Sequence, residues 1–519
     1  MRDFTASLPP EVQRTILSYL VPNVALQHAR LVNKQWSAVA ATLLWHQLHV
    51  DLHLYHADRP RFNALLNSSP NGILDNVKKL GISSSLTTSN PLQTQQTTSI
   101  LLKLLSALPR DNLSSLHSET LPVHPDVICV LLRTQSQLRE LSIPTDEDSS
   151  DGLPGGAYAR NNLSHLEKIT VDVSGASQQT YRGVCAWFAY APKLHEVSIK
   201  GRHHNDPAFN RFGGWAASAQ PHLVKLRRLA VRDICFMGTP YRIVQHLDLP
   251  SLEYLSLREC FNAGPFLLSL AQKFKQSDEP VLRNFSHCQV SMSEDVQEAS
   301  AELIGSVNSL THLNIGLMEG GLMDLECLKM SGRSLIHLHL LCMDVEFPYY
   351  SAVDLVQLRL LCPKLEHLSI DIGDLNSFFD DVGLNEPFRL AEHTGYMKKL
   401  EVIAQYANLV SLSITDPALL DGEYSANERR LIYTEVASQL FQELAEHGSH
   451  LQRLHFSSRL YESMEAEADE DGHTWPRYAF ERGNVSVTRY GQQVTVKTLA
   501  VPAPQDVRGL TCGAGWEAV

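Results

Sequence analysis

The 519-residue chain has no long uncharged apolar run, and its first ten residues, MRDFTASLPP, contain no apolar segment of the kind that opens a secretory signal. It has nine cysteines, an odd number, and none of them forms a Cys-x-x-Cys pair. Scattered single cysteines are typical of reduced thiols in an intracellular protein rather than of a disulfide framework. We therefore expect a chain that does not enter membranes and that resides in the cytoplasm, the nucleus or both.

Basic residues are in the minority, with 44 Lys and Arg against 57 Asp and Glu, so the formal net charge is −13. Nucleic acids and anionic membranes attract basic surfaces, so we expect neither among the partners of this chain. The hydrophobic share of 44% and the charged share of 19% are ordinary for a folded protein. The length exceeds one compact core, which predicts several domains or repeats.

The chain also lacks the short motifs that accompany catalysis. It contains no GxxxxGK[ST] phosphate loop, no strand-linked GxGxxG, no GxSxG nucleophile elbow and no HExxH zinc motif. His203, His204 and Asp206 carry metal-binding groups, but adjacent side chains point in different directions on most backbones. We expect a protein that performs no catalysis itself and that holds no cofactor and no metal.

The stretch from Leu8 to Trp45 has the pattern of three short helices. Val12, Ile16 and Leu20 recur at helical spacing and give the first helix an apolar face. Pro22 ends this helix because proline cannot continue the backbone hydrogen bonding. A second helix carries Leu26, Ala29 and Leu31, and a third runs from about Asn33 to Trp45.

This stretch resembles an F-box. The residues that carry the resemblance are Leu8-Pro9 with Glu11, followed by ILSYL, ARLVNKQW and LLW. The resemblance implies docking on a Skp-type adaptor and, through it, membership of a cullin–RING ubiquitin ligase. Trp36 is suited both to the small core of the helices and to part of the interface, whereas Leu8 and Pro9, at the edge, are suited to the interface. Carried over by position, the adaptor-facing candidates are Leu8, Pro9, Ile16, Leu17, Leu20, Leu31, Val32 and Trp36.

Beyond Trp45 a six-residue unit of the form Leu-x-x-Leu-x-Leu/Ile/Val recurs along the chain. Between Leu138 and Leu365 the copies begin 25 to 32 residues apart, slightly more than the leucine-rich-repeat period of roughly 20–29. Helical patterns lie between copies, as at residues 181–190, 351–361 and 426–447. The clear copies begin at Leu138, Leu166, Leu194, Leu226, Leu252, Leu282, Leu310, Leu335, Leu365, Leu409 and Leu451, and weaker ones at Val77 and Leu113.

Short strands that alternate with return helices are typical of a solenoid. The repeated units resemble degenerate leucine-rich repeats. They are degenerate because only Cys260 clearly occupies the position where that family has Asn or Cys. The alternative is a flat, doubly wound sheet. We favour the solenoid, because strand twist accumulates and makes a single open, flat sheet of so many strands unusual. We predict an α/β protein with a three-helix F-box at residues 1–52 and a curved leucine-rich-repeat-like solenoid of short parallel strands and return helices at 53–460. A tail at 461–519 follows, and alternating residues around Tyr490-Gly491 predict a β-hairpin over 483–501 that caps the open end. The polar residues 83–99 are expected to form a loop.

Positions three, five and seven of each repeat strand face away from the core, on the concave surface. Position three places histidines in successive repeats. This column is either a chance cluster among 23 histidines or a polar, pH-sensitive recognition surface. A zinc site is the least favoured alternative, because no carboxylate or thiol is clearly directed at the column. A locally basic patch lies a few repeats earlier. The candidate target-binding residues are Arg228, Arg232, Tyr254, Arg258, His312, His337, His339 and His367.

These observations favour a substrate-recognition subunit of a Skp/cullin/F-box-type ubiquitin ligase. Its N-terminal helices would bind the adaptor, and its solenoid would bind a target protein. The alternative is a non-degradative interaction scaffold with an F-box-like segment. A third hypothesis, an enzyme on a repeat fold, has no motif in its favour.

Overall fold

The computed structural model describes residues 8–18, 23–52, 60, 63, 66, 73–83, 91–118, 123–144, 163–172, 187, 191–201, 225–236, 251–277, 281–289, 294–317, 321–342, 349–373, 394–416, 426–458, 467–468, 474–475, 478–489 and 492–502. The chain divides into two compact units. The N-terminal unit comprises Met1–Leu252 and Cys260–Asn262, and the C-terminal unit comprises Glu253–Glu259 and Ala263–Val519. The domain boundaries expected after residues 52 and 460 stay predictions.

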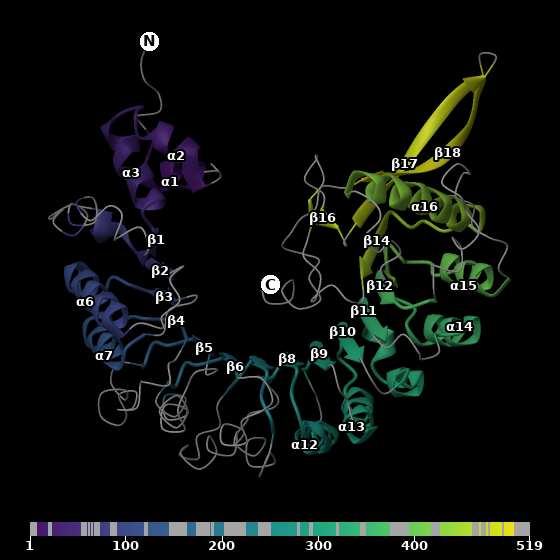
Figure 1. Cartoon of the computed structure of the whole chain (residues 1–519), viewed down its shortest axis with the longest axis horizontal. Coiled ribbons are helices and arrows are strands. Elements are labelled where there is room, and N and C mark those ends of the chain that lie inside the picture. Colours follow the sequence, from purple (N-terminus) through teal and green to yellow (C-terminus); the bar gives the residue numbers. More distant parts are fainter. Residues whose placement is uncertain are drawn as a thin grey trace. The chain divides into compact units, whose positions relative to one another are not determined.

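The N-terminal unit begins with the three expected helices, α1 (Pro10–Ser18), α2 (Asn23–Ala29) and α3 (Lys34–Leu44) (Figure 1). Asn33 caps α3, because its side-chain oxygen accepts a hydrogen bond of 2.9 Å from the backbone N–H of Trp36. Strand β1 (Gln47–Asp51) follows and pairs in parallel with β2 (Lys79–Ser83). The repeat pattern did not predict β1, which joins the helices directly to the sheet.

The sheet of the N-terminal unit continues in chain order, and its described pairings are parallel. Helices α6 (Pro91–Ala107) and α7 (Pro125–Thr134) lie on the same side of the strands, and η2 (Ile73–Asn76) is a short 3₁₀ turn. Because α6 begins at Pro91, the loop expected over 83–99 is wrong for its second half. The further strands are β3 (Ser115–Ser118), β4 (Glu140–Pro144), β5 (Lys168–Asp172), β6 (Glu196–Lys200) and β7 (Arg228–Arg232).

The C-terminal unit repeats the same parallel order. Its strands are β8 (Tyr254–Arg258), β9 (Asn284–Gln289), β10 (His312–Leu317), β11 (His337–Cys342), β12 (His367–Ile370), β13 (Ser411–Asp416) and β14 (Arg453–Ser458). Its helices are α12 (Gly264–Gln276), α13 (Glu294–Gly305), α14 (Ala352–Leu361), α15 (Thr394–Ala404) and α16 (Ala426–Glu446), with 3₁₀ turns η4 (Leu325–Lys329) and η5 (Gly332–Ser334). The α/β solenoid of short parallel strands and return helices is therefore confirmed in both units. The helix expected at 181–190 falls almost entirely outside the described residues.

Two antiparallel strands close the sheet of the C-terminal unit. Strand β17 (Tyr478–Arg489) pairs with β14 on one side and with β18 (Gln492–Pro502) on the other. A small ribbon, β15 (Glu467–Ala468) with β16 (Thr474–Trp475), precedes them. The hairpin thus provides hydrogen-bond partners for the backbone groups at the edge of β14, which would otherwise be exposed.

The core of each repeat follows the leucine spacing. Leu335, Leu338 and Leu340, at positions one, four and six of one unit, are all buried, and Leu355 and Leu358 of α14 are buried as well. Burying one such side chain stabilises the fold by about 1.5–3 kcal/mol, and each repeat relies on its neighbours for that burial. In the described part of the chain, no helix combines the length and the apolar character needed to cross a membrane.

Candidate functional site

The N-terminal helices pack around a small apolar core. Leu17, Leu26, Ala29 and Ala40 are buried, and the ring of Trp36 packs partly buried against them. The segment before α1 is tied to this bundle, because the carbonyl of Leu8 accepts hydrogen bonds from Gln13 Nε2 (3.0 Å) and Gln35 Nε2 (3.2 Å). Leu8 itself is half-buried, and Pro9 is exposed.

Four large aliphatic side chains stay exposed on the same helices. Leu31 and Val32, in the turn between α2 and α3, are 83% and 56% exposed, and Val12 and Ile16 on α1 are both 42% exposed. Exposed aliphatic groups on a small helical unit are typical of a docking surface. We call Val12, Ile16, Leu31 and Val32 the apolar surface set.

The structure divides the predicted adaptor-facing residues into two groups. Pro9, Ile16, Leu31 and Val32 are exposed, whereas Trp36 has the intermediate burial expected of a residue that belongs to core and surface. Leu17 is 0% exposed, which corrects the expectation that it faces a partner; it fills the core because its position on α1 points toward α3. Leu20 lies outside the described residues. Val12 was assigned to the apolar face of the first helix but not to the adaptor-facing candidates, although its spacing from Ile16 places both on one side of α1.

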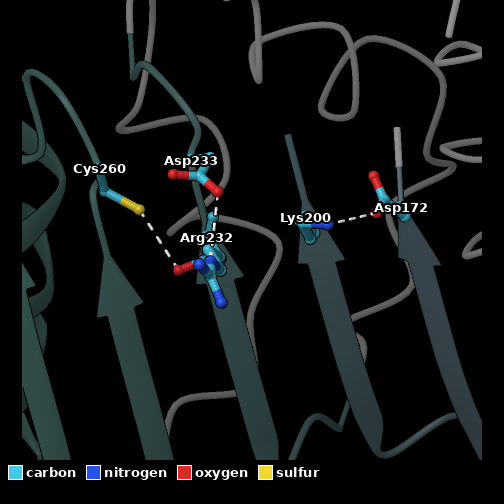
Figure 2. A network of polar contacts seen from close by, with 6 residues as sticks. Asp172, Lys200, Arg232, Asp233 and Cys260 are labelled. Carbon is cyan, nitrogen blue, oxygen red and sulfur yellow. Dashed lines mark hydrogen bonds and ion pairs between the residues drawn. The ribbon is translucent and has the colours of Figure 1, made fainter. Parts of the chain in front are cut away.

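The predicted basic patch is electrically balanced within the N-terminal unit. Glu196 on β6 lies 2.6 Å from Lys168 Nζ on β5 and 3.9 Å from Arg228 Nε on β7. The strand ends continue this pairing, since Lys200 Nζ donates to Asp172 at 2.7 Å and Arg232 Nε donates to Asp233 at 3.2 Å (Figure 2). The basic side chains of this patch therefore have acidic partners close by, and the patch lacks the surplus of positive charge that the sequence suggested.

Cys260 lies beside the same strand ends, and its thiol donates to the backbone carbonyl of Val231 at 3.4 Å (Figure 2). This hydrogen bond joins one repeat to the previous one. Tyr254 and Arg258 belong to the C-terminal unit. Tyr254 is only 7% exposed, which corrects the expectation of an open aromatic group there.

The predicted histidine column is present in the C-terminal unit as a stack of rings. The register pairs His312 with His337 and His337 with His367 on neighbouring parallel strands. The ring centroids of the first pair are 4.2 Å apart at an interplanar angle of 9°, and those of the second pair are 4.1 Å apart at 3°. We call these three residues the histidine ladder.

Burial favours the uncharged form of each ring of the ladder. It lowers the pKa of His337 to about 3, with further lowering by His312 and His367 on either side. The pKa values of His312 and His367 are also lowered, in each case mainly by burial. Burial lowers the pKa of His339, beside the ladder on β11, to about 4.

Position five adds further polar groups to this face. From β11 to β14 the register aligns His339, Ser369, Ser413 and His455. Burial lowers the pKa of His455 to about 4, with smaller contributions from Arg453 and His367. Within the described part of the chain, no set of three His, Cys, Asp or Glu side chains is arranged to hold a metal ion.

Comparison with known proteins finds a family match at the N-terminus. Residues 5–51 match the model of the F-box-like family. No curated protein matches the chain. Among solved structures, a crystal structure of a Bacteroides fragilis protein is similar at 12% identity, with 50% of this chain and 71% of that chain covered and a TM-score of 0.31.

The family match covers α1, α2, α3 and β1, and therefore includes the whole apolar surface set. F-box-like domains are protein-interaction domains. The chain carries an F-box-like domain at residues 5–51, followed by an α/β solenoid.

Proposed function

We propose that this chain is the substrate-recognition subunit of a Skp/cullin/F-box-type ubiquitin ligase. The observation that carries the proposal is the apolar surface set: Leu31 and Val32 are exposed although the same helices contain a filled core. A Skp-type adaptor that covers this surface would bury apolar area at about 25 cal/mol per Å². The F-box-like family match supports the same partner.

In this proposal the chain itself breaks and forms no bonds. The N-terminal helices hold the adaptor and, through it, a cullin–RING assembly in the cytoplasm or nucleus. The solenoid holds a target protein, so that target lysines have a high effective concentration near a charged ubiquitin-conjugating enzyme.

The test is co-purification of the full chain with a Skp-type adaptor. The double substitution Leu31→Asp/Val32→Asp places two charges on the surface without entering the core. We expect it to lower adaptor affinity at least 100-fold while circular dichroism and the melting temperature stay near those of the unsubstituted chain. The matched control is Val353→Asp/Leu360→Asp, because these aliphatic residues of α14 are also largely exposed but lie in the C-terminal unit. Equal adaptor binding by both double variants would refute the proposal.

The rival function is a scaffold that binds the adaptor without ubiquitin transfer to its partners. Both functions require the apolar surface set, so adaptor binding does not separate them. The half-life of captured partners does: deletion of this chain lengthens the half-life of at least one partner of a ligase receptor and of none bound to a scaffold.

A further inference from the structure

The histidine ladder ends abruptly at one side. In the register of position three, His367 of β12 is followed by Ser411 of β13 and then by Arg453 of β14. Adjacent strands are about 4.8 Å apart, so one small side chain separates an imidazole from a guanidinium that lies two strands away. The ring face of His367 toward β13 therefore has no described ring to stack on, in contrast to its other face.

Two polar side-chain atoms around this position lack hydrogen-bond partners among the described residues. The side-chain Oγ of Ser369 and Nδ1 of His455 are buried and make no hydrogen bond. The described residues also provide no hydrogen bond to the ring nitrogens of His337 and His367. A buried polar atom without a partner costs about 1–3 kcal/mol, which a ligand that supplies acceptors would recover.

The charges that face the ladder favour an anion. Positions three and five of β10 to β14 contain no carboxylate. Burial is the main cause that lowers the pKa of His367; Glu366, directly before β12, raises it, and Arg453 of β14 lowers it by a smaller amount. Glu481 of β17 lies 3.7 Å from Arg453, in a pair whose side chains are both more than half exposed, so it neutralises that cation weakly. Position seven of the repeat that contains His367 holds one buried carboxylate, Asp371, which raises the pKa of Lys399 on α15 against the larger lowering by burial.

We propose that the surface formed by His337, His367, Ser411, Arg453 and His455 binds carboxylates of an acidic peptide segment and takes up a proton as it does so. The segment belongs to a protein partner, and in that respect the inference rests on the proposed function. A carboxylate is planar and offers oxygen acceptors in its plane, which suits the position over Ser411 between an imidazole and a guanidinium. An anion placed there favours the charged form of the imidazoles, which burial otherwise disfavours.

The test uses the full chain and a fluorescein-labelled hexaglutamate peptide at pH 5.5, 6.5 and 7.5 and constant ionic strength. We expect binding that strengthens by up to about tenfold for each unit of pH decrease, the limit for uptake of one proton. Calorimetry in two buffers of different ionisation enthalpy counts the protons taken up by the unsubstituted chain. The probe controls are hexaglutamine and a phosphoserine peptide of equal charge.

Two variants locate the site. His367→Asn removes the terminal ring of the ladder, and Arg453→Gln removes the neighbouring guanidinium; each is expected to weaken hexaglutamate binding at pH 5.5 at least tenfold. His450→Gln is the matched control, since this exposed histidine precedes β14 and lies outside the ladder. Folding of each variant is checked by circular dichroism. If a variant fails to fold, the number of protons that the unsubstituted chain takes up on binding hexaglutamate still tests the proposal.

The inference is overturned by affinity that does not change with pH, by a proton count of zero, by equal loss in the control variant, or by tighter binding of the phosphoserine peptide. Adaptor co-purification tests the proposed function separately, because Leu31→Asp/Val32→Asp leaves the C-terminal unit unchanged. Loss of adaptor binding from the ladder variants is not expected.

Discussion

The imidazole rings of His337 and His367 stack 4.1 Å apart because β11 and β12 pair them directly in a parallel register. His312 stacks on the other side of His337. The central ring is therefore shielded from water and flanked by two groups that acquire the same charge. Its pKa of about 3 follows from both effects, of which burial is the larger.

His337 should therefore remain neutral at pH 4.5, where an unperturbed histidine, with a pKa near 6.5, is protonated. Imidazole chemical shifts measured by NMR across pH 3 to 8 provide the check. The substitution His312→Asn should raise the pKa of His337 only partly, because the larger cause, burial, remains. A midpoint for His337 above pH 6 would contradict the buried stack.

His287 should make the C-terminal unit sensitive to acid. This histidine occupies the sixth, core-facing position of its repeat, is fully buried, and has its Nδ1 atom 2.9 Å from Ser300 Oγ. Burial lowers its pKa to about 4, so between pH 6.5 and 4 the unfolded chain binds more protons than the folded one. The free energy of unfolding therefore decreases as pH falls through this window, by up to about 3 kcal/mol from this residue.

The substitution His287→Leu restores the usual residue of the repeat and removes this acid sensitivity. Ser300 keeps a partner, because its hydroxyl also donates to the carbonyl of Val296 at 2.8 Å. We expect the variant to be more stable than the unsubstituted chain at pH 5 and to gain less at pH 7. Urea unfolding at both pH values measures the difference. An equal shift at the two pH values would show that His287 does not titrate in this window.

Substitution of Gln135 should destabilise the N-terminal unit more than substitution of a polar residue on its surface. It is fully buried; its Oε1 accepts from the N–H groups of Asn112 (3.0 Å) and Leu113 (2.9 Å), and its Nε2 donates to the carbonyl of Pro109 (3.0 Å). The substitution Gln135→Leu leaves these backbone groups without partners, at about 1–3 kcal/mol for each. Chemical denaturation should show the loss, whereas Gln357→Leu, which removes a surface hydrogen bond to Glu326, should cost less than about 0.5 kcal/mol.

Truncation to alanine should destabilise the helical core at Leu17 but should hardly change its stability at Leu31. Leu17→Ala opens a cavity in the small helical core and should destabilise it by about 2–5 kcal/mol, whereas Leu31→Ala removes an exposed side chain and should change stability by less than about 0.5 kcal/mol. Hydrogen exchange of α1 to α3 measures both. Faster exchange in Leu31→Ala than in Leu17→Ala would contradict the assignment of core and surface.

The repeat positions could be predicted from the sequence because one physical requirement recurs. Leucines at positions one, four and six must be buried by neighbouring repeats, and each strand from β2 to β14 begins two residues after the first position of its unit. The same register explains why the column of His312, His337 and His367 was visible in advance. Their stacking depends only on residues placed at equal positions in consecutive repeats.

Other features depend on contacts that no local pattern contains. The charge of Arg228 is balanced by Glu196 of the preceding repeat, and a count of basic residues on one face overlooks such pairs. Leu17 and Ile16 are adjacent and equally apolar, so only the packing of α1 decides which one is buried. Helix α6 begins in a Thr- and Gln-rich stretch, where buried residues of its second half, such as Leu104, decide the conformation.

The hairpin of β17 and β18 should keep the C-terminal unit monomeric. Phe480 of β17 is buried with its ring edge-on to Phe456 of β14 at a centroid distance of 6.0 Å, and the backbones of the two strands pair from residue 453 to 456. Removal of residues 478–519 would expose both the apolar face and the hydrogen-bonding edge of β14, and an open parallel edge pairs readily with another chain. We expect this truncated chain to self-associate in size-exclusion chromatography with light scattering. Removal of residues 503–519 alone retains the hairpin and should leave the chain monomeric, so self-association of both truncated chains to the same extent would show that the hairpin does not protect β14.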